Sequence, residues 1–334
     1  MMKETKYNNI INLKDTIMKK ILLAVTAALA ITSCSQNEEF EAPAQKAEIN
    51  FNTAVTRAVE MNTDALKQAG FQVYAYNTGT TVMSNQVELS SSPWIDGLAT
   101  YNTQWSVAGG PYYWPLTDKL QFFAYSPAAG VTYTATDKGY PKLTYAVQAK
   151  ATDQKDLVIA SVENATKAKN GATSAVSLAF KHALTQINIE VTKADGYTYN
   201  ISSVKVAGVK GSGVFTYTGV DTGTWEASTD AAVSYDYALG GFTANTTAVV
   251  KDNALMLIPQ ALTDAKISIS YTVQKDGSTI ADNSKEIALP ASTPWEFGTK
   301  ILYKLTLPID AEEIGLTATV SEWDEQTGPT VPYE

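Results

Sequence analysis

The sequence predicts an all-β protein that folds as two tandem β-sandwich domains. Residues 48–334 consist of short runs rich in Val, Ile, Thr, Tyr and Phe, separated by Gly, Asn, Asp, Ser and Pro. That pattern is typical of antiparallel sheets packed as sandwiches. Apolar and polar residues also alternate with a period of two, which predicts strands with one buried and one solvated face, over residues 187–191, 267–273 and 303–307.

The length and the turn residues indicate where the two domains lie. About 300 residues follow the leader segment, which is more than one hydrophobic core usually organises. A polar, turn-forming stretch at 193–200 follows a strongly alternating strand. The expected domains are therefore residues 48–193 and residues 194–334.

Helix signals are weak in this sequence. Residues 61–70 predict one short helix, capped by Thr63 or Asp64 and ended by Gly70. The glycines of residues 208–213 predict a hairpin turn, because the segment lacks the Lys-Ser/Thr pair of a phosphate-binding loop.

The leader segment has the three parts of a secretory signal peptide. Two lysines precede the apolar residues 21–31, and small residues follow before Cys34, the only cysteine. The apolar run is too short to cross a membrane, which takes about 20 residues. The sequence thus predicts a signal peptide over residues 1–33, with Met18 as an alternative start. A cysteine at the cleavage point resembles the lipobox of bacterial lipoproteins, which implies acylation of Cys34 (palmitate) and an outer-membrane anchor. A chance thiol near a plain signal peptide is the alternative.

Residues 34–47 are polar, acidic and contain proline, which predicts an unfolded linker. Residues 36–39 of this linker, Gln-Asn-Glu-Glu, resemble the acidic export signal that sends some lipoproteins to the outer face of the outer membrane. Incidental charge in a solvated linker is the other interpretation. We expect the protein at the cell surface.

The residue types do not predict catalysis. His182, the only histidine, stands at the head of an alternating strand and is expected to be a sheet or turn residue rather than a general base. The sequence has neither a Gly-x-Ser-x-Gly motif nor a cluster of metal-ligating side chains, and its adjacent glutamates diverge. We therefore expect no enzyme, no cofactor and no metal. A formal charge of -9 argues against nucleic acid as a partner.

A group of aromatic residues has two interpretations. These side chains could stack on sugars, but core and loop packing is the favoured reading of their spacing. The residues concerned are Trp94, Trp105, Tyr112, Tyr113, Trp114, Phe122, Phe123 and Tyr125.

Several segments, taken in order, resemble the fimbrillins, the subunits of type V pili. The matching segments are residues 50–58, 112–127, 154–161, 176–191, 255–273, 295–307 and 317–323. The resemblance implies two transthyretin-like β-sandwich domains. It also implies export as a lipoprotein and cleavage after an arginine by a trypsin-like surface protease, which removes the lipid together with the first strand. The resulting groove would accept a strand from the next subunit. Arg57, followed by Ala58, matches the cleavage position.

The residues before Arg57 have the pattern of an edge strand. Ile49, Phe51 and Val55 point one way, and the residues between them point the other. This segment is the expected displaced strand. The alternative is that Arg57 is a solvated loop charge in an uncut sandwich.

A second segment with apolar residues on one face lies near the carboxyl terminus and has the pattern that a donor strand requires. Ile314, Leu316, Ala318 and Val320 share one face, which makes them candidates for the donor strand. A final strand paired within its own domain is equally compatible. The expected function is a structural pilin that polymerises with other pilin subunits into surface fimbriae for adhesion or biofilm formation. The alternative is an uncleaved surface lipoprotein or tip adhesin that binds a glycan or a host protein.

Overall fold

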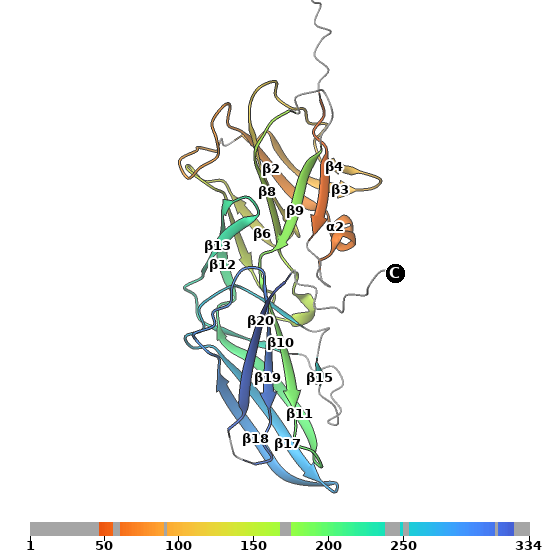
Figure 1. The fold of residues 1–334 in the computed structure, drawn as a ribbon, viewed down its shortest axis with the longest axis vertical. Helices are drawn as coiled ribbons and strands as arrows, with labels where there is room; N and C mark the ends of the chain where they lie inside the picture. Colours follow the sequence, from red (N-terminus) through yellow and green to blue (C-terminus); the bar gives the residue numbers. More distant parts are fainter. Residues whose placement is uncertain are drawn as a thin grey trace, which may run out of the picture. The chain divides into compact units, whose positions relative to one another are not determined.

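The computed structural model describes residues 47–55, 61–89, 92–167, 175–237, 248–249, 254–310 and 313–323 (Figure 1). The strands within these ranges form four sheets, which confirms the all-β prediction. The helices described are α2 (Thr63–Ala69) and the 3-10 helix η2 (Ala151–Asp153). Neither has the length or the apolar character that a membrane-spanning helix needs. The predicted signal peptide and nearly all of the acidic linker lie outside the described residues.

The first sheet has seven strands. Along the sheet they are β1 (Phe51–Val55), β9 (Val176–His182), β8 (Val158–Ala165), β5 (Leu120–Ser126), β2 (Phe71–Asn77), β3 (Ile95–Tyr101) and β4 (Trp105–Val107). β1 runs parallel to β9, whereas the other neighbours in this sheet are antiparallel. β1 and β4 are thus the two terminal strands.

The second sheet joins strands that lie on both sides of residue 193. Its order is β13 (Thr222–Ala227), β12 (Ser212–Gly219), β7 (Lys142–Ala146) and β6 (Val131–Thr134). Phe215 of β12 pairs with Leu143 of β7. The division into two transthyretin-like domains at residue 193 stays a prediction, and any such division has to place β12 and β13 with strands of the first half.

The third and fourth sheets contain the remaining strands. The third is β15 (Ala248–Val249), β10 (Thr185–Thr192), β19 (Thr299–Thr306) and β20 (Gly315–Glu322), with β16 (Leu255–Leu257) also on β10. The fourth is β14 (Val233–Asp236), β11 (Thr198–Val209), β17 (Lys266–Lys275) and β18 (Ser278–Ala288). The alternating segments 187–191 and 267–273 fall in β10 and β17, and segment 303–307 falls in β19 except for Leu307, which confirms those strand predictions.

The central strand of the first sheet, β5, is buried on both faces. Phe122 and Ala124 of β5 belong to one hydrophobic cluster, and Phe123 and Tyr125 of the same strand belong to another. Because neighbouring residues of a strand point to opposite faces, the apolar run 122–125 contributes to two cores at once.

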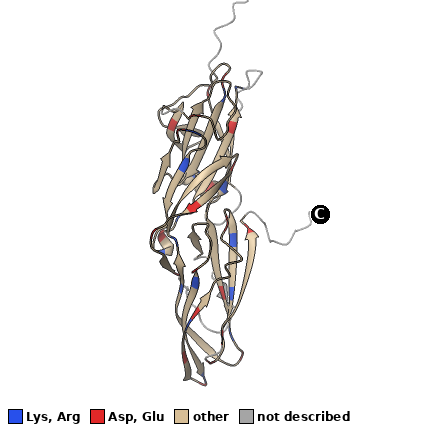
Figure 2. Ribbon diagram, turned by 90° about the vertical axis from the view of Figure 1, so that its left-hand side faces the viewer, with Lys and Arg blue, Asp and Glu red and all other residues tan. Residues whose placement is uncertain are grey.

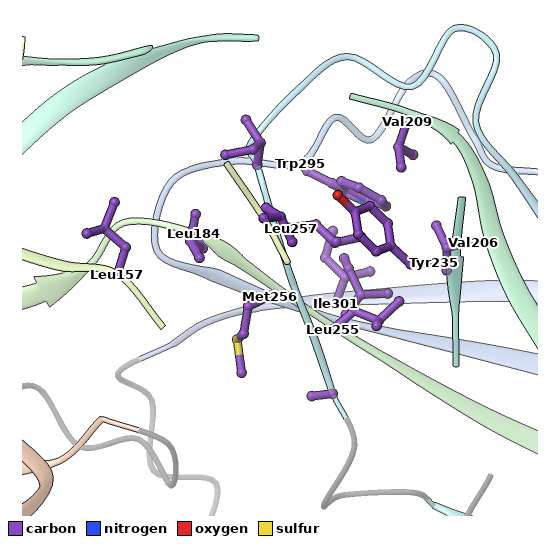
Figure 3. Close-up of a cluster of buried hydrophobic side chains, with 14 of the residues drawn as sticks. Leu157, Leu184, Val206, Val209, Tyr235, Leu255, Met256, Leu257, Trp295 and Ile301 are labelled. Carbon is purple, nitrogen blue, oxygen red and sulfur yellow. The ribbon is translucent and has the colours of Figure 1, made fainter. Parts of the chain in front are cut away.

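The larger cluster continues between the strands of the third and fourth sheets. Figure 3 shows its centre, where Leu255 and Leu257 of β16 lie close to Ile301 of β19 and Val206 of β11. The buried Trp295 indole donates a hydrogen bond from Nε1 to the Tyr303 hydroxyl at 2.9 Å. This bond satisfies a polar group that would otherwise reduce the gain from burying the ring.

Helix α2 forms where it was predicted but has a different cap. The Asn62 side chain accepts hydrogen bonds from the backbone N–H groups of Asp64 (3.0 Å) and Ala65 (2.9 Å). The predicted caps, Thr63 and Asp64, were wrong because both already lie inside the helix. Gly70 ends the helix as predicted, and its N–H donates to the Leu66 carbonyl at 2.8 Å.

The segment 208–213 is not a hairpin turn, which corrects the sequence prediction. β11 ends at Val209 and pairs with β14 and β17, whereas β12 begins at Ser212 and pairs with β7 and β13. The chain therefore crosses from one sheet to another here. The tight hairpin lies instead between β17 and β18, where Asp276 and Gly277 both have positive φ, as a type I′ turn requires.

We expect Gly208→Ala to destabilise the fold by about 3 kcal/mol, because it combines two costs. Gly208 has a φ of +74°, in the left-handed region, and an added Cβ would lie 2.1 Å from the Asp264 carbonyl oxygen. Gly277→Ala is the matched control, since φ is +80 there but nothing lies within 4 Å. Its cost should be about 1 kcal/mol. Urea unfolding of both variants measures the difference, and equal midpoints would contradict the role of the Asp264 carbonyl.

Candidate functional site: two terminal strands

β1 is hydrogen-bonded to a single strand. All five of its residues pair with β9, from Phe51 opposite Val176 to Val55 opposite Phe180. No further strand follows β1 in the described sheet order. The predicted displaced strand therefore lies at the end of a sheet, where one row of backbone groups is not committed to the ladder.

The side chains of this segment are buried on one face. Ile49, Phe51 and Val55 are each 6% exposed and belong to the core cluster that the first sheet encloses. The Phe51 ring contacts Phe71 and Phe122 edge to face, with centroids 5.9 and 6.0 Å away. Burial of side chains, in addition to the single ladder, holds β1 in place.

The residues just before β1 make a second attachment. The Ile49 N–H donates to the Tyr112 carbonyl at 2.8 Å, and the Trp114 N–H donates to the Ala47 carbonyl at 2.9 Å. The Trp105 indole, on β4, donates from Nε1 to the Thr53 hydroxyl at 3.1 Å. This bond joins the two terminal strands of the first sheet.

A cavity of about 360 Å³ lies beside β1. Its lining includes Ile49 and Phe51 together with Trp105, Val107 and Tyr112. The space between β1 and β4 is therefore only partly filled, although both strands border it.

β20 is the corresponding terminal strand of the third sheet, beside β19 (Figure 1). Its eight residues pair antiparallel with β19, from Gly315 opposite Thr306 to Glu322 opposite Thr299. This pairing lies within the chain itself, so donation of β20 to another subunit stays a prediction. The four candidate donor residues are poorly covered: Ile314 and Leu316 are half-buried, Ala318 is exposed and Val320 is 46% exposed.

The two terminal strands β1 and β20 carry little charge. Acidic and basic residues are interspersed along the strands of the described chain (Figure 2). β1 contains no charged residue, and β20 contains one, its last residue Glu322. Apart from Glu322 at the end of β20, both strands therefore offer uncharged edges to a partner.

The predicted modification residues cannot be placed in the structure. Cys34, Arg57 and Ala58 lie outside the described residues. β1 ends at Val55, two residues before Arg57, so a cut after Arg57 would leave the whole of β1 on the amino-terminal fragment.

His182 lies in a buried cluster that the sequence did not reveal. It is the last residue of β9 and is 1% exposed, and its Nδ1 lies 2.5 Å from Asp156 Oδ2. The Trp323 indole, next to the end of β20, stacks on the imidazole with centroids 4.4 Å apart and planes 5° apart. Burial raises the pKa of the Asp156 carboxyl, and the neighbouring His182 opposes that rise. We call Trp323, His182 and Asp156 the Trp323 cluster.

Sequence reasoning missed Asp156 and Trp323 as partners of His182. The three residues are distant in the sequence, and the only local signal is a tryptophan directly after an alternating strand. The described part of the chain holds no group of three or more His, Cys, Asp or Glu side chains placed to bind a metal ion.

The aromatic group splits into core residues and surface residues. Trp105, Phe122, Phe123 and Tyr125 are buried, which favours the packing interpretation for them. Trp94 is 39% exposed, and its Nε1 donates to the Tyr113 carbonyl at 2.9 Å. That bond fixes the indole against the neighbouring loop.

Comparison with known proteins agrees with this architecture. Residues 56–323 match the model of the family described as fimbrillin-like. This match covers most of the chain, so the protein belongs to the fimbrillin-like family, and the resemblance inferred from the sequence is confirmed.

Two known proteins illustrate the similarity. The fimbrium subunit Fim1C of Phocaeicola vulgatus is 29% identical, over 94% of this chain and 99% of that protein. A crystal structure of a fimbrial protein from Bacteroides vulgatus has a TM-score of 0.63 at 23% identity, covering 83% of this chain and 99% of the other. At that identity the second likeness speaks for the fold alone.

We expect Phe51→Ala to lower the free energy of unfolding by about 3 kcal/mol or more, because it removes a buried ring from a well-packed site. Asn52→Ala is the matched control, since Asn52 is exposed on the same strand. That change should stay within about 0.5 kcal/mol. Chemical denaturation of the uncut protein measures both, and a small effect of Phe51→Ala would show that β1 is not held by its side chains.

Proposed function

We propose that this chain is a structural pilin that is exported as a lipoprotein, cleaved after Arg57 and polymerised by donor-strand exchange into surface fimbriae for adhesion or biofilm formation. The observation that carries the proposal is the place of β1, which ends its sheet, pairs with β9 alone and buries Ile49, Phe51 and Val55. Membership of the fimbrillin-like family and the relative named as a fimbrium subunit support the same function.

Loss of β1 would create an acceptor groove. The backbone edge of β9 would become available for pairing, and the rings of Phe71 and Phe122 would lose the cover of Phe51. An uncovered apolar floor beside a free strand edge is the structure that β-strand addition requires.

β20 has the side-chain pattern to fill such a groove. Its apolar residues Leu316, Ala318 and Val320 recur at every second position, and Ile49, Phe51 and Val55 lie on one face of the segment 49–55 with Thr53 between them. A strand with that spacing presents one continuous apolar face. A β20 strand from a second copy could therefore place a row of apolar side chains where β1 had placed its own.

The energetics favour exchange over simple loss of β1. Burying a large apolar side chain contributes about 1.5 to 3 kcal/mol, so three buried side chains make spontaneous departure of β1 rare. In its own sheet β20 gains much less, because Val320 is 46% exposed and Ala318 is exposed as well. Transfer of β20 into an apolar groove would thus bury surface that is open to water in the monomer.

The basic residues support Arg57 as the processing site. Arg57 is the only arginine of the sequence, and every other basic side chain besides His182 is a lysine. A trypsin-like protease with strict preference for arginine would therefore cut the whole chain at one bond. The fragment released would contain the lipid on Cys34 together with β1, and before this cut the lipid would hold the protein at the outer membrane.

Treatment of the purified protein with an arginine-specific protease tests processing and assembly together. We expect a new amino terminus at Ala58, followed by ladders of oligomers on unboiled gels, because the groove beside β9 becomes available. Arg57→Lys is the matched control: it keeps the charge, and should resist the protease and stay monomeric. Resistance of the wild-type bond, with monomers under every condition, would favour the uncleaved surface lipoprotein that binds a glycan or a host protein.

Labelling with palmitate tests the anchor. In a bacterium that makes outer-membrane lipoproteins, we expect the label in the uncut protein and its complete loss in Cys34→Ser, because the chain has no other cysteine. After cleavage at Arg57, the label should be found on the amino-terminal fragment, which contains Cys34. Label that persists in Cys34→Ser would contradict lipidation at this residue.

A further inference from the structure

β20 is held unevenly along its length. Its backbone pairs with β19 throughout, yet Val320 is 46% exposed and the alternate apolar positions are at best half-buried. Trp323, directly after the strand, is 1% exposed. The side-chain burial that retains this strand is therefore concentrated at its carboxyl end.

Trp323 lies in a defined site, called its seat below, which is formed by His182, Gly298 and Lys300. Its ring stacks on His182, its backbone N–H donates to the Gly298 carbonyl at 2.9 Å, and Lys300 Nζ lies 5.8 Å from the ring centroid. The stacking partner is itself fixed, because Asp156 bonds to His182 Nδ1 from the segment before β8. A rigid, buried surface thus receives the indole.

The same seat carries features that allow release. The Trp323 Nε1 and the Asp156 Oδ1 have no hydrogen-bond partner among the described residues. Buried polar groups without partners reduce the stability gained from burial, and Trp323 Nε1 would regain a partner in water. A cavity of about 230 Å³ borders Trp323, His182 and Phe297, so the ring has open space beside it.

The seat lies on the strand that would form the acceptor groove. β9 pairs with β1 over residues 176–180 and ends at His182. The first five residues of β9 therefore pair with the strand that would leave, and its last residue, His182, contacts the tryptophan that anchors β20.

We propose that the Trp323 cluster is the retention device of β20: the stacking of Trp323 on His182 keeps the strand in its own sheet, and departure of the indole makes it available to another molecule. Retention stands on the contacts alone, whereas the use of the released strand rests on the proposed function. Trp323 and His182 are positioning residues here, because they act through β20 and not by contact with the partner.

Hydrogen exchange of the uncut monomer tests retention directly. We expect Trp323→Ala to speed exchange of the β20 amides at least about tenfold, since it removes a large buried ring. Trp323→Phe keeps a ring stacked on the imidazole, so its β20 amides should exchange at a rate between those of Trp323→Ala and the wild type. Thr319→Ala is the matched control, because it shortens an exposed side chain on the other face of the same strand, away from the candidate donor residues, and should leave exchange nearly unchanged. Amides of β17 should keep their protection in all variants, which verifies the fold.

The outcomes separate this proposal from the proposed function. Unchanged β20 exchange in Trp323→Ala would overturn the retention role, even if cleaved protein still formed oligomers. Faster exchange, with oligomers that form sooner after cleavage at Arg57, supports retention and donation together. Faster exchange without oligomers in any variant would support retention and refute donation of β20.

Discussion

The pairing of β1 with β9 alone is the constraint on which the rest of this structure depends. A central strand is held by two ladders, but β1 has one, so its side chains carry much of its stability. Phe51 supplies this by fitting edge to face between Phe71 and Phe122. The same contacts that keep β1 in place therefore define the shape and the apolar character of the groove that its loss would open.

β9 connects the features that bear on function. Its first five residues pair with β1, its last residues Lys181 and His182 pair with β8, and the His182 ring seats Trp323. A change in the order of β9 would thus affect β1, which pairs with it, and Trp323, which follows β20 and stacks on the last residue of β9. The physical basis is direct contact: each step is a pair of hydrogen-bonded strand residues or the ring stack at 4.4 Å.

Sequence reasoning succeeded where the information is local. Alternation over residues 267–273 predicts β17, and Gly70 predicts the end of α2, since both follow from backbone geometry. The same alternation singled out Phe51 and its neighbours. Sequence reasoning failed at residues 208–213, because turn residues do not say which sheet the next strand joins. β12, which follows this segment, pairs with β7, far back in the chain. The Trp323 cluster was hidden for the same reason: His182 and Asp156 meet only in the folded protein.

The edges of the sheets indicate why β20 differs from other terminal strands. β18 is a longer edge strand, but it carries Asp282, Lys285 and Glu286, and charges on an edge discourage pairing with other chains. β4 is blunted in another way, since it is only 3 residues long. β20 has eight residues and no charge before Glu322, and it leaves Val320 open to water. An uncharged, apolar edge of this length favours association with a partner strand. β1 is also an uncharged terminal strand, but it buries Phe51 and Val55 in its own core, whereas the apolar side chains of β20 are poorly covered.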